Sequence, residues 1–205
     1  TGIGRATAVE LAGRGHEVVA TARRPETLEG IDVAERHGLD VDDDASVQAA
    51  VAVAGAVDVL VNNAGWESAG PVEKADLDEV RAMFETNLLG AARMIQAVLP
   101  AMRERGGGTI VNVSSVAGVV AGPLNGFYSA SKHALEALSE SLHYEVGHFG
   151  IRVVIIEPGA FATAFGDNAR RHGEDGPPYD ELRRQWDTAA GVLTGPDSRP
   201  VGFDM

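Results

Sequence analysis

Short apolar runs alternate with longer amphipathic stretches along most of the 205-residue chain. The short runs are rich in Val and Ile, like buried parallel strands. We expect strands at residues 16–22, 37–40, 57–61, 109–113 and 151–156. Apolar residues at helical spacing predict helices at residues 4–14, 45–54, 77–105 and 128–149. In the first of these helices, Val9 and Leu11 are expected to face inward.

The alternation of strands and helices predicts an α/β fold, with a parallel sheet covered by helices on both faces. The length fits a single domain over residues 1–205. Ligands of such sheets bind at the carboxyl ends of the strands. Three groups of residues with chemical or conformational importance directly follow predicted strands, namely Asn62–Gly65, Ser114-Ser115 and Pro158-Gly159.

The spacing of Tyr128 and Lys132 predicts a general acid/base on a helix. Residues four apart share one helical face, with Cβ atoms about 5–6 Å apart. An ammonium at that range favours phenolate, so we expect a lowered pKa for Tyr128. Only Lys74 and Lys132 are lysines. We interpret Lys74 as a loop residue and Lys132 as a position that needs a compact ammonium.

Two other polar residues accompany this pair. Ser115 lies thirteen residues before Tyr128, at the end of the predicted strand 109–113. Asn87 lies within the predicted helix 77–105, where an amide has poor helix propensity and a core-facing Asn needs partners. At the start of the chain, Gly2-Ile3-Gly4 precedes a helix. It fits either the end of a phosphate-binding turn or a plain turn.

The chain resembles the short-chain dehydrogenase/reductase family in six motifs, which occur in the family's order and at its spacings. These are Gly2-Ile3-Gly4, Asn62-Asn63-Ala64-Gly65, Asn87, Ser115, Tyr128-x-x-x-Lys132 and Pro158-Gly159. The resemblance covers roughly residues 1–163. It implies a Rossmann-type doubly wound parallel sheet and an NAD(P)-dependent oxidoreductase (EC 1.1.1.-) that interconverts a carbonyl and an alcohol.

The resemblance implies a role for each of four catalytic residues. Tyr128 would protonate the carbonyl oxygen as hydride arrives, and Lys132 would lower its pKa and hold the nicotinamide ribose. Ser115, rather than its neighbour Ser114, would orient the substrate carbonyl. Asn87 would position a water in the proton relay, although a purely structural Asn is an alternative.

The resemblance also implies a set of residues that contact the cofactor. They are Gly2, Ile3, Gly4, Asp40, Val41, Asn63, Ala64, Gly65, Tyr128, Lys132, Pro158, Gly159 and Thr163. An acid at the end of the second strand would bind a ribose 2′-hydroxyl. The chain instead carries Arg23 and Arg24 there. Guanidinium groups grip phosphate, which predicts NADP over NAD; two ordinary surface arginines are the alternative.

The two ends of the chain depart from the family pattern. Family members begin with a strand and a fuller glycine turn, of which Gly2 and Gly4 remain. The preceding strand would be central in the sheet, and its loss would exceed typical stability margins of about 5–15 kcal/mol. We therefore expect these residues to be a fragment of a longer polypeptide. After Thr163 no clear final strand follows.

Residues 160–193 are expected to form the substrate loop. Phe161, Phe165, Tyr179 and Trp186 are its aromatic residues. They suggest an apolar pocket and a hydrophobic carbonyl or alcohol substrate. The same side chains would equally serve to pack the loop onto the body of the protein.

Composition excludes several other classes. A formal net charge of −13 argues against nucleic-acid binding. The chain has no cysteine, its histidines form no ligand pattern, and we expect no metal. No apolar run approaches the roughly 20 residues of a membrane span, so we expect a cytoplasmic protein. The family resemblance implies a homodimer or homotetramer paired through helices 77–105 and 128–149.

Three functional alternatives stand beside the reductase. One is a nicotinamide-binding regulatory protein without turnover, and another is an inactive fragment. Retention of Ser115, Tyr128 and Lys132 argues against the regulatory protein, because a sensor does not need an acid/base. The third is a sugar-nucleotide epimerase or dehydratase, which would usually carry a larger C-terminal substrate domain.

Overall fold

The structure is a computed structural model that describes residues 2–159, 165, 169–173 and 177–194. Two residues predicted to be functional, Phe161 and Thr163, lie outside the described residues. No helix within the described ranges is both long and apolar enough to span a membrane.

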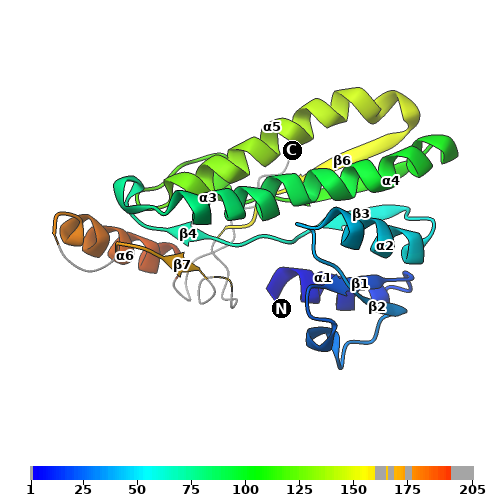
Figure 1. The fold of residues 1–205 in the computed structure, drawn as a ribbon, viewed down its shortest axis with the longest axis horizontal. Coiled ribbons are helices and arrows are strands. Elements are labelled where there is room, and N and C mark those ends of the chain that lie inside the picture. The colour runs from blue at the N-terminus through cyan, green and yellow to red at the C-terminus, as the bar shows by residue number, and fades with distance from the viewer. Residues whose placement is uncertain (1, 160–164, 166–168, 174–176, 195–205) are drawn as a thin grey trace.

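The elements follow the predicted alternation (Figure 1). The helices are α1 (Gly2–Gly13), α2 (Asp44–Ala54), α3 (Leu77–Phe84), α4 (Ala91–Arg105), α5 (Gly126–Val146) and α6 (Asp180–Thr194). The strands are β1 (Val19–Ala22), β2 (Glu35–Gly38), β3 (Val59–Asn62), β4 (Ser68–Ala69), β5 (Gly108–Val113), β6 (Ile151–Ile156) and β7 (Arg170–Arg171).

The parallel strands form two main sheets. One has the order β3-β5-β6, and the other pairs β1 with β2. Among the described residues no hydrogen-bonded pairing joins β1 to β3. The α/β fold with parallel strands is therefore confirmed.

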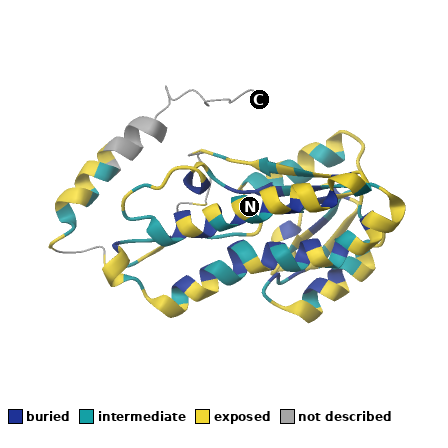
Figure 2. Cartoon of the chain, turned by 90° about the horizontal axis from the view of Figure 1, so that it is seen from above, coloured by how far each residue is buried: buried dark blue, intermediate teal, exposed yellow. Residues whose placement is uncertain are grey.

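Helices α4 and α5 pack on one face of the three-stranded sheet, and α2 packs against α4. The main core lies between them, and its fully buried side chains include Val47, Met102, Ile110 and Ile151. Figure 2 shows buried and exposed positions alternating along these helices, as expected when one face packs inward.

The predicted helix 77–105 has no break, but it is not α-helical throughout. A π-helical segment, η3 (Glu85–Gly90), separates α3 from α4. A π turn inserts an extra residue into the helical repeat, and apolar spacing does not reveal such an insertion. Pro100 lies inside α4 without ending it.

The inward face of α1 also differs from the prediction. Val9 is 47 % exposed, and no residue of α1 is buried. The side chains that face the small apolar cluster beside β1 are Ala8 and Ala12. Placing Val9 inward was wrong, because the small alanines allow close packing where the larger valine points outward.

A second parallel ribbon pairs β4 with β7, so residues just after β3 lie beside the C-terminal part of the chain. Helix α6 lies beyond β7 at one end of the molecule (Figure 1). Trp186 of α6 packs against Gly122. A Cβ atom added to Gly122 would lie 2.8 Å from the indole ring of Trp186. This aromatic side chain thus packs the loop onto the body, which was one of the two expectations for it.

Candidate active site

Tyr128 and Lys132 lie one turn apart on α5, and both are buried. Ser115 follows β5 and caps the short 3-10 helix η4 (Val116–Gly118), with its Oγ accepting a hydrogen bond from Ala117 N at 3.1 Å. Helix α5 packs against η4, and Ser115 lies close enough to the Tyr128 phenol to act to lower its pKa. The structure thus brings Ser115, Tyr128 and Lys132 together at the carboxyl end of β5.

The pKa of Tyr128 shifts opposite to the sequence-based expectation. Burial of the phenol raises its pKa to about 12, and the nearby carboxylate of Glu67 adds to the rise. Ser115 acts in the other direction without reversing the shift. Expecting a lowered pKa was wrong, because burial of the phenol is the largest contribution to the shift.

The ammonium of Lys132 has a specific partner. Its Nζ donates a hydrogen bond to Val113 O at 2.9 Å and lies 5.9 Å from the centroid of the Tyr128 ring. Burial lowers the pKa of Lys132 to about 8, although the carboxylate of Glu136 favours the charged form. The hydrogen bond fixes the amine between the end of β5 and the phenol.

Asn87 is almost completely buried in η3 and connects three segments. Its Oδ1 accepts from Trp66 N at 2.9 Å, and its Nδ2 donates to Trp66 O at 3.0 Å. The same Nδ2 donates to Ser131 Oγ on α5 at 3.0 Å. The side chain therefore fixes the turn after β3 against α5, next to Tyr128 and Lys132.

Two glycines of the predicted cofactor site are packed closely against neighbouring side chains, where a Cβ would not fit without a shift. A Cβ on Gly65 would lie 3.1 Å from Asn87 Oδ1 and 3.6 Å from Lys132 Nζ, and a Cβ on Gly4 would lie 2.4 Å from Asn63 Nδ2. Gly2 has a positive φ of 59° at the start of α1. Ile3 and Ala64 flank these glycines in sequence. A helix that begins at glycine exposes its first backbone N–H groups, and such a terminus fits the phosphates of a dinucleotide.

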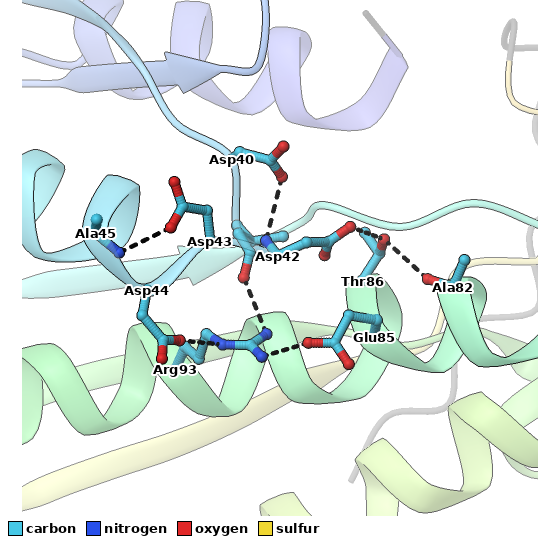
Figure 3. A network of polar contacts seen from close by, with 10 residues as sticks. Asp40, Asp42, Asp43, Asp44, Ala45, Ala82, Glu85, Thr86 and Arg93 are labelled. Carbon is cyan, nitrogen blue, oxygen red and sulfur yellow. Dashed lines mark hydrogen bonds and ion pairs between the residues drawn. The ribbon is translucent and has the colours of Figure 1, made fainter.

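A polar network connects the loop after β2 to η3 (Figure 3). Asp42 Oδ2 accepts from Thr86 Oγ1 at 2.8 Å, and Asp42 N donates to Asp40 Oδ1 at 3.2 Å. Arg93 is paired with Asp44 and Glu85 and also contacts the carbonyl of this loop's Val41.

Val41 lies directly against the π-helical segment, since a Cβ on Gly90 would be 2.6 Å from Val41 Cγ2. Arg23 and Arg24 are exposed after β1. Arg23 lies near the Asp42 carboxylate, whose pKa is raised by burial although Arg23 acts to lower it. Arg23, which we predict to bind the cofactor 2′-phosphate, thus lies near the acidic side chain of Asp42.

The predicted nicotinamide segment lies beside the serine loop. Pro158 O accepts from Val116 N at 3.0 Å, and Gly159 is exposed. On the substrate side, the Phe165 ring lies 6.0 Å from the Tyr128 ring, centroid to centroid. Of the predicted pocket aromatics, Phe165 therefore adjoins the proposed acid/base.

Sequence reasoning missed four residues of this site, namely Trp66, Glu67, Thr86 and Ser131. Trp66 Nε1 donates to Thr86 Oγ1 at 3.2 Å, which continues the Asp42 network to the turn after β3. Only Trp66 carried a signal, since a tryptophan directly after Gly65 is unusual in a strand-end turn. Glu67, Thr86 and Ser131 gave no such signal, because their contacts form only through the π-helical segment η3 and the pairing of β4 with β7.

Comparison with known proteins supports this geometry. A family model described as short chain dehydrogenase matches residues 1–174. The chain is 43% identical over 172 residues to 3-ketodihydrosphingosine reductase of Bacteroides thetaiotaomicron, covering 82% of this chain and 63% of that relative. It therefore spans less than two thirds of the length of this curated relative.

The chain is also similar to solved structures of dehydrogenases. A short-chain dehydrogenase from Streptomyces avermitilis superposes with a TM-score of 0.83 at 43% identity, covering 92% of this chain and 74% of that one. A gluconate 5-dehydrogenase from Burkholderia cenocepacia J2315, in complex with NADP and tartrate, gives 0.72 at 32% identity, covering 81% and 71%. The sequence match, the fold and the arrangement at the strand ends agree, and the chain belongs to the short-chain dehydrogenase/reductase family of oxidoreductases.

Proposed function

We propose that the protein transfers hydride between NADP(H) and a carbonyl/secondary alcohol pair, with Tyr128 as the general acid/base. The observation that carries this proposal is that Ser115, Tyr128 and Lys132 lie together where η4 packs on α5, with Tyr128 and Lys132 both buried. Two hydroxyls that converge in a buried site are suited to bind one carbonyl oxygen.

In the proposed reduction, Gly4, Gly65 and Lys132 would help to hold NADPH, which would supply the hydride for the new C–H bond at the carbonyl carbon. Ser115 and Tyr128 hydrogen-bond the carbonyl oxygen and stabilise the charge that develops as the C=O π bond breaks. Tyr128 then gives its proton to that oxygen and becomes phenolate. The Lys132 ammonium, 5.9 Å from the ring centroid, favours this phenolate. Asn87 positions the turn after β3 through the Trp66 peptide.

Reduction and oxidation start from different protonation states of Tyr128. With its pKa raised to about 12 by burial, the phenol keeps its proton across the neutral range, as carbonyl reduction requires at its start. Alcohol oxidation would start from the phenolate.

The proposed substrate is hydrophobic near the carbonyl. Support comes from Phe165, whose ring lies next to Tyr128, and from the similarity to a relative named 3-ketodihydrosphingosine reductase. A panel of aryl and long-chain ketones, assayed by NADPH oxidation, tests the proposal. We expect turnover of at least one apolar ketone; NADPH that stays unoxidised with every carbonyl would refute it.

The proposed preference for NADP rests on Arg23 and Arg24, exposed at the end of β1, and agrees with the NADP complex of a related structure. Replacing both by Ser should raise the KM for NADPH by about tenfold or more, since a charge-assisted phosphate contact contributes about 1.5–3 kcal/mol. The KM for NADH should change little. Equal effects on both cofactors would show that these arginines do not read the 2′-phosphate.

We also propose a homodimer or homotetramer paired through α4 and α5. Tyr144 on α5 is 73 % exposed, and a large exposed aromatic side chain is a frequent interface anchor. Replacing Tyr144 by Glu should shift the oligomer toward monomer in light scattering. A monomeric mass for the unaltered protein would overturn this pairing.

A further inference from the structure

Arg170 joins the predicted substrate loop to the turn after β3, and the hydride-transfer mechanism gives it no role. It lies on β7, which pairs in parallel with β4 (Figure 1). Arg170 N donates to Glu67 O at 2.9 Å, and a second backbone bond runs from His172 N to Ala69 O at 3.0 Å. A ribbon of two such short strands is marginally stable by itself, so side-chain contacts decide how firmly β7 is held.

The guanidinium of Arg170 lies over the indole of Trp66. The distance from Arg170 Cζ to the centroid of the Trp66 ring is 4.3 Å. At this range the negative face of an indole attracts a cation. A planar guanidinium can also stack on the ring, which an ammonium cannot do.

The second contact of the Arg170 side chain is an ion pair with Glu79 of α3. Arg170 Nη1 lies 3.4 Å from Glu79 Oε1, and the Arg170 side chain is 60% exposed. Exposed ion pairs contribute little to stability, because water and salt screen them. We therefore expect the contact with Trp66, rather than the ion pair, to hold β7.

Trp66 provides a fixed surface beside the proposed acid/base. Asn87 binds both the N–H and the carbonyl of Trp66, and Trp66 Nε1 donates to Thr86 Oγ1 at 3.2 Å. Trp66 also packs against the apolar cluster that contains Met83 and Tyr128. Because its peptide and its indole are both held, a group that stacks on Trp66 is fixed relative to Tyr128.

The substrate loop contacts this region at two positions. The Phe165 ring lies 6.0 Å from the Tyr128 ring, centroid to centroid, and Arg170 follows five residues later. Five residues span at most about 18 Å even when fully extended. Fixing Arg170 on Trp66 therefore limits the positions that Phe165 can take beside Tyr128.

We propose that Arg170 is a positioning residue that fastens the substrate loop at the active site by stacking on Trp66. It acts through Phe165 and so affects the binding of an apolar ketone rather than hydride transfer itself. This inference rests on the proposed function, because the ketone must bind beside Phe165 and Tyr128. The competing role for Arg170 is a surface ion pair with Glu79 that leaves substrate binding unchanged.

Arg170→Gln tests this role in steady-state kinetics with the apolar ketone of the above panel that is reduced fastest. The KM for the ketone should rise about fivefold or more, as expected for the loss of a partly desolvated cation–π contact. The kcat and the KM for NADPH should stay unchanged. Arg170→Lys, which keeps the cation without the planar group, should show a smaller rise. Arg14→Gln, which removes an exposed ion pair within α1, should leave all three constants unchanged.

Glu79→Gln separates the stacking contact from the ion pair. It removes the carboxylate and leaves Arg170 over Trp66. If stacking fastens the loop, Glu79→Gln should raise the ketone KM much less than Arg170→Gln does. Equal rises in the two variants, or no rise in either, would overturn the inference.

Hydrogen exchange keeps this inference distinguishable from the proposed function, because it requires no turnover. The N–H groups of Arg170 and His172 donate across the ribbon, so peptides that contain them report whether β7 stays paired with β4. In Arg170→Gln these N–H groups should exchange about fivefold faster or more, while those of α5 keep their rates. Faster exchange confined to β7 supports the inference even where no ketone is reduced. Unchanged exchange in β7 would overturn it, even where ketones are reduced and the proposed function stands.

Discussion

The side-chain amide of Asn87 holds the peptide of Trp66 on both sides, accepting from its N–H and donating to its carbonyl. The amide also donates to Ser131 of α5. One side chain thus ties the turn after β3 to the helix that carries Tyr128 and Lys132. This makes Asn87 a positioning residue whose loss should affect both stability and turnover.

Replacing Asn87 by Ala should lower the free energy of unfolding by about 2–4 kcal/mol, because buried peptide groups of Trp66 lose their partners. Urea unfolding followed by Trp fluorescence measures this change. Ser131→Ala removes only the hydrogen bond between Asn87 and α5, and it should lower the free energy of unfolding by about 1 kcal/mol. An unchanged urea midpoint for Asn87→Ala would mean that the amide does not hold this turn.

The pH dependence of reduction should follow Lys132. Burial lowers its pKa to about 8, so the ammonium is lost as the pH rises through that value, while Tyr128, with a pKa of about 12, stays protonated. We expect kcat/KM for reduction to be flat up to about pH 7 and to fall above pH 8.

Lys132→Arg provides the matched control for this profile, since a guanidinium stays charged throughout the range. The kcat/KM of Lys132→Arg should be lower than that of the unaltered protein, because a planar guanidinium replaces a compact ammonium. Its pH profile should lack the decline near pH 8. A profile for the unaltered protein that stays flat to pH 10 would contradict the assignment to Lys132.

Replacing Lys132 by Met should stabilise the protein while removing activity. The folded pKa of about 8 lies below the ordinary value of 10.5, so the buried ammonium costs stability below pH 8, and the cost disappears as the pH rises to 10.5. A pKa shift of this size corresponds to about 3 kcal/mol in the free energy of unfolding. Lys132→Met also loses the hydrogen bond from Nζ to Val113 O, which offsets about 1 kcal/mol of that gain.

Urea unfolding at pH 7 should therefore show Lys132→Met more stable by about 1–3 kcal/mol. At pH 10 the gain should shrink, because the unaltered protein then buries a largely neutral amine. A loss of stability at pH 7 would show that the ammonium is better compensated than its lowered pKa indicates.

The site could be predicted from the sequence where geometry is local. Tyr128 and Lys132 share a helical face because they are four residues apart, and Ser115 follows a strand whose end must lie at the same sheet edge. The structure bears out these placements.

Features that depend on long-range packing could not be predicted. The π-helical turn that positions Asn87 leaves the apolar pattern unchanged. The direction of the Tyr128 pKa shift depends on burial and on Glu67, which the sequence places 61 residues away. Arg23 and Asp42 likewise lie near each other although they belong to different loops, one after β1 and one after β2.

The most direct test of the proposed chemistry is single-turnover hydride transfer from NADPH to a reducible ketone by Tyr128→Phe. The variant keeps the buried ring and loses only the phenolic hydroxyl. We expect it to bind NADPH normally in a fluorescence titration and to transfer hydride at least about a thousandfold more slowly. Hydride transfer at the unaltered rate would contradict the account.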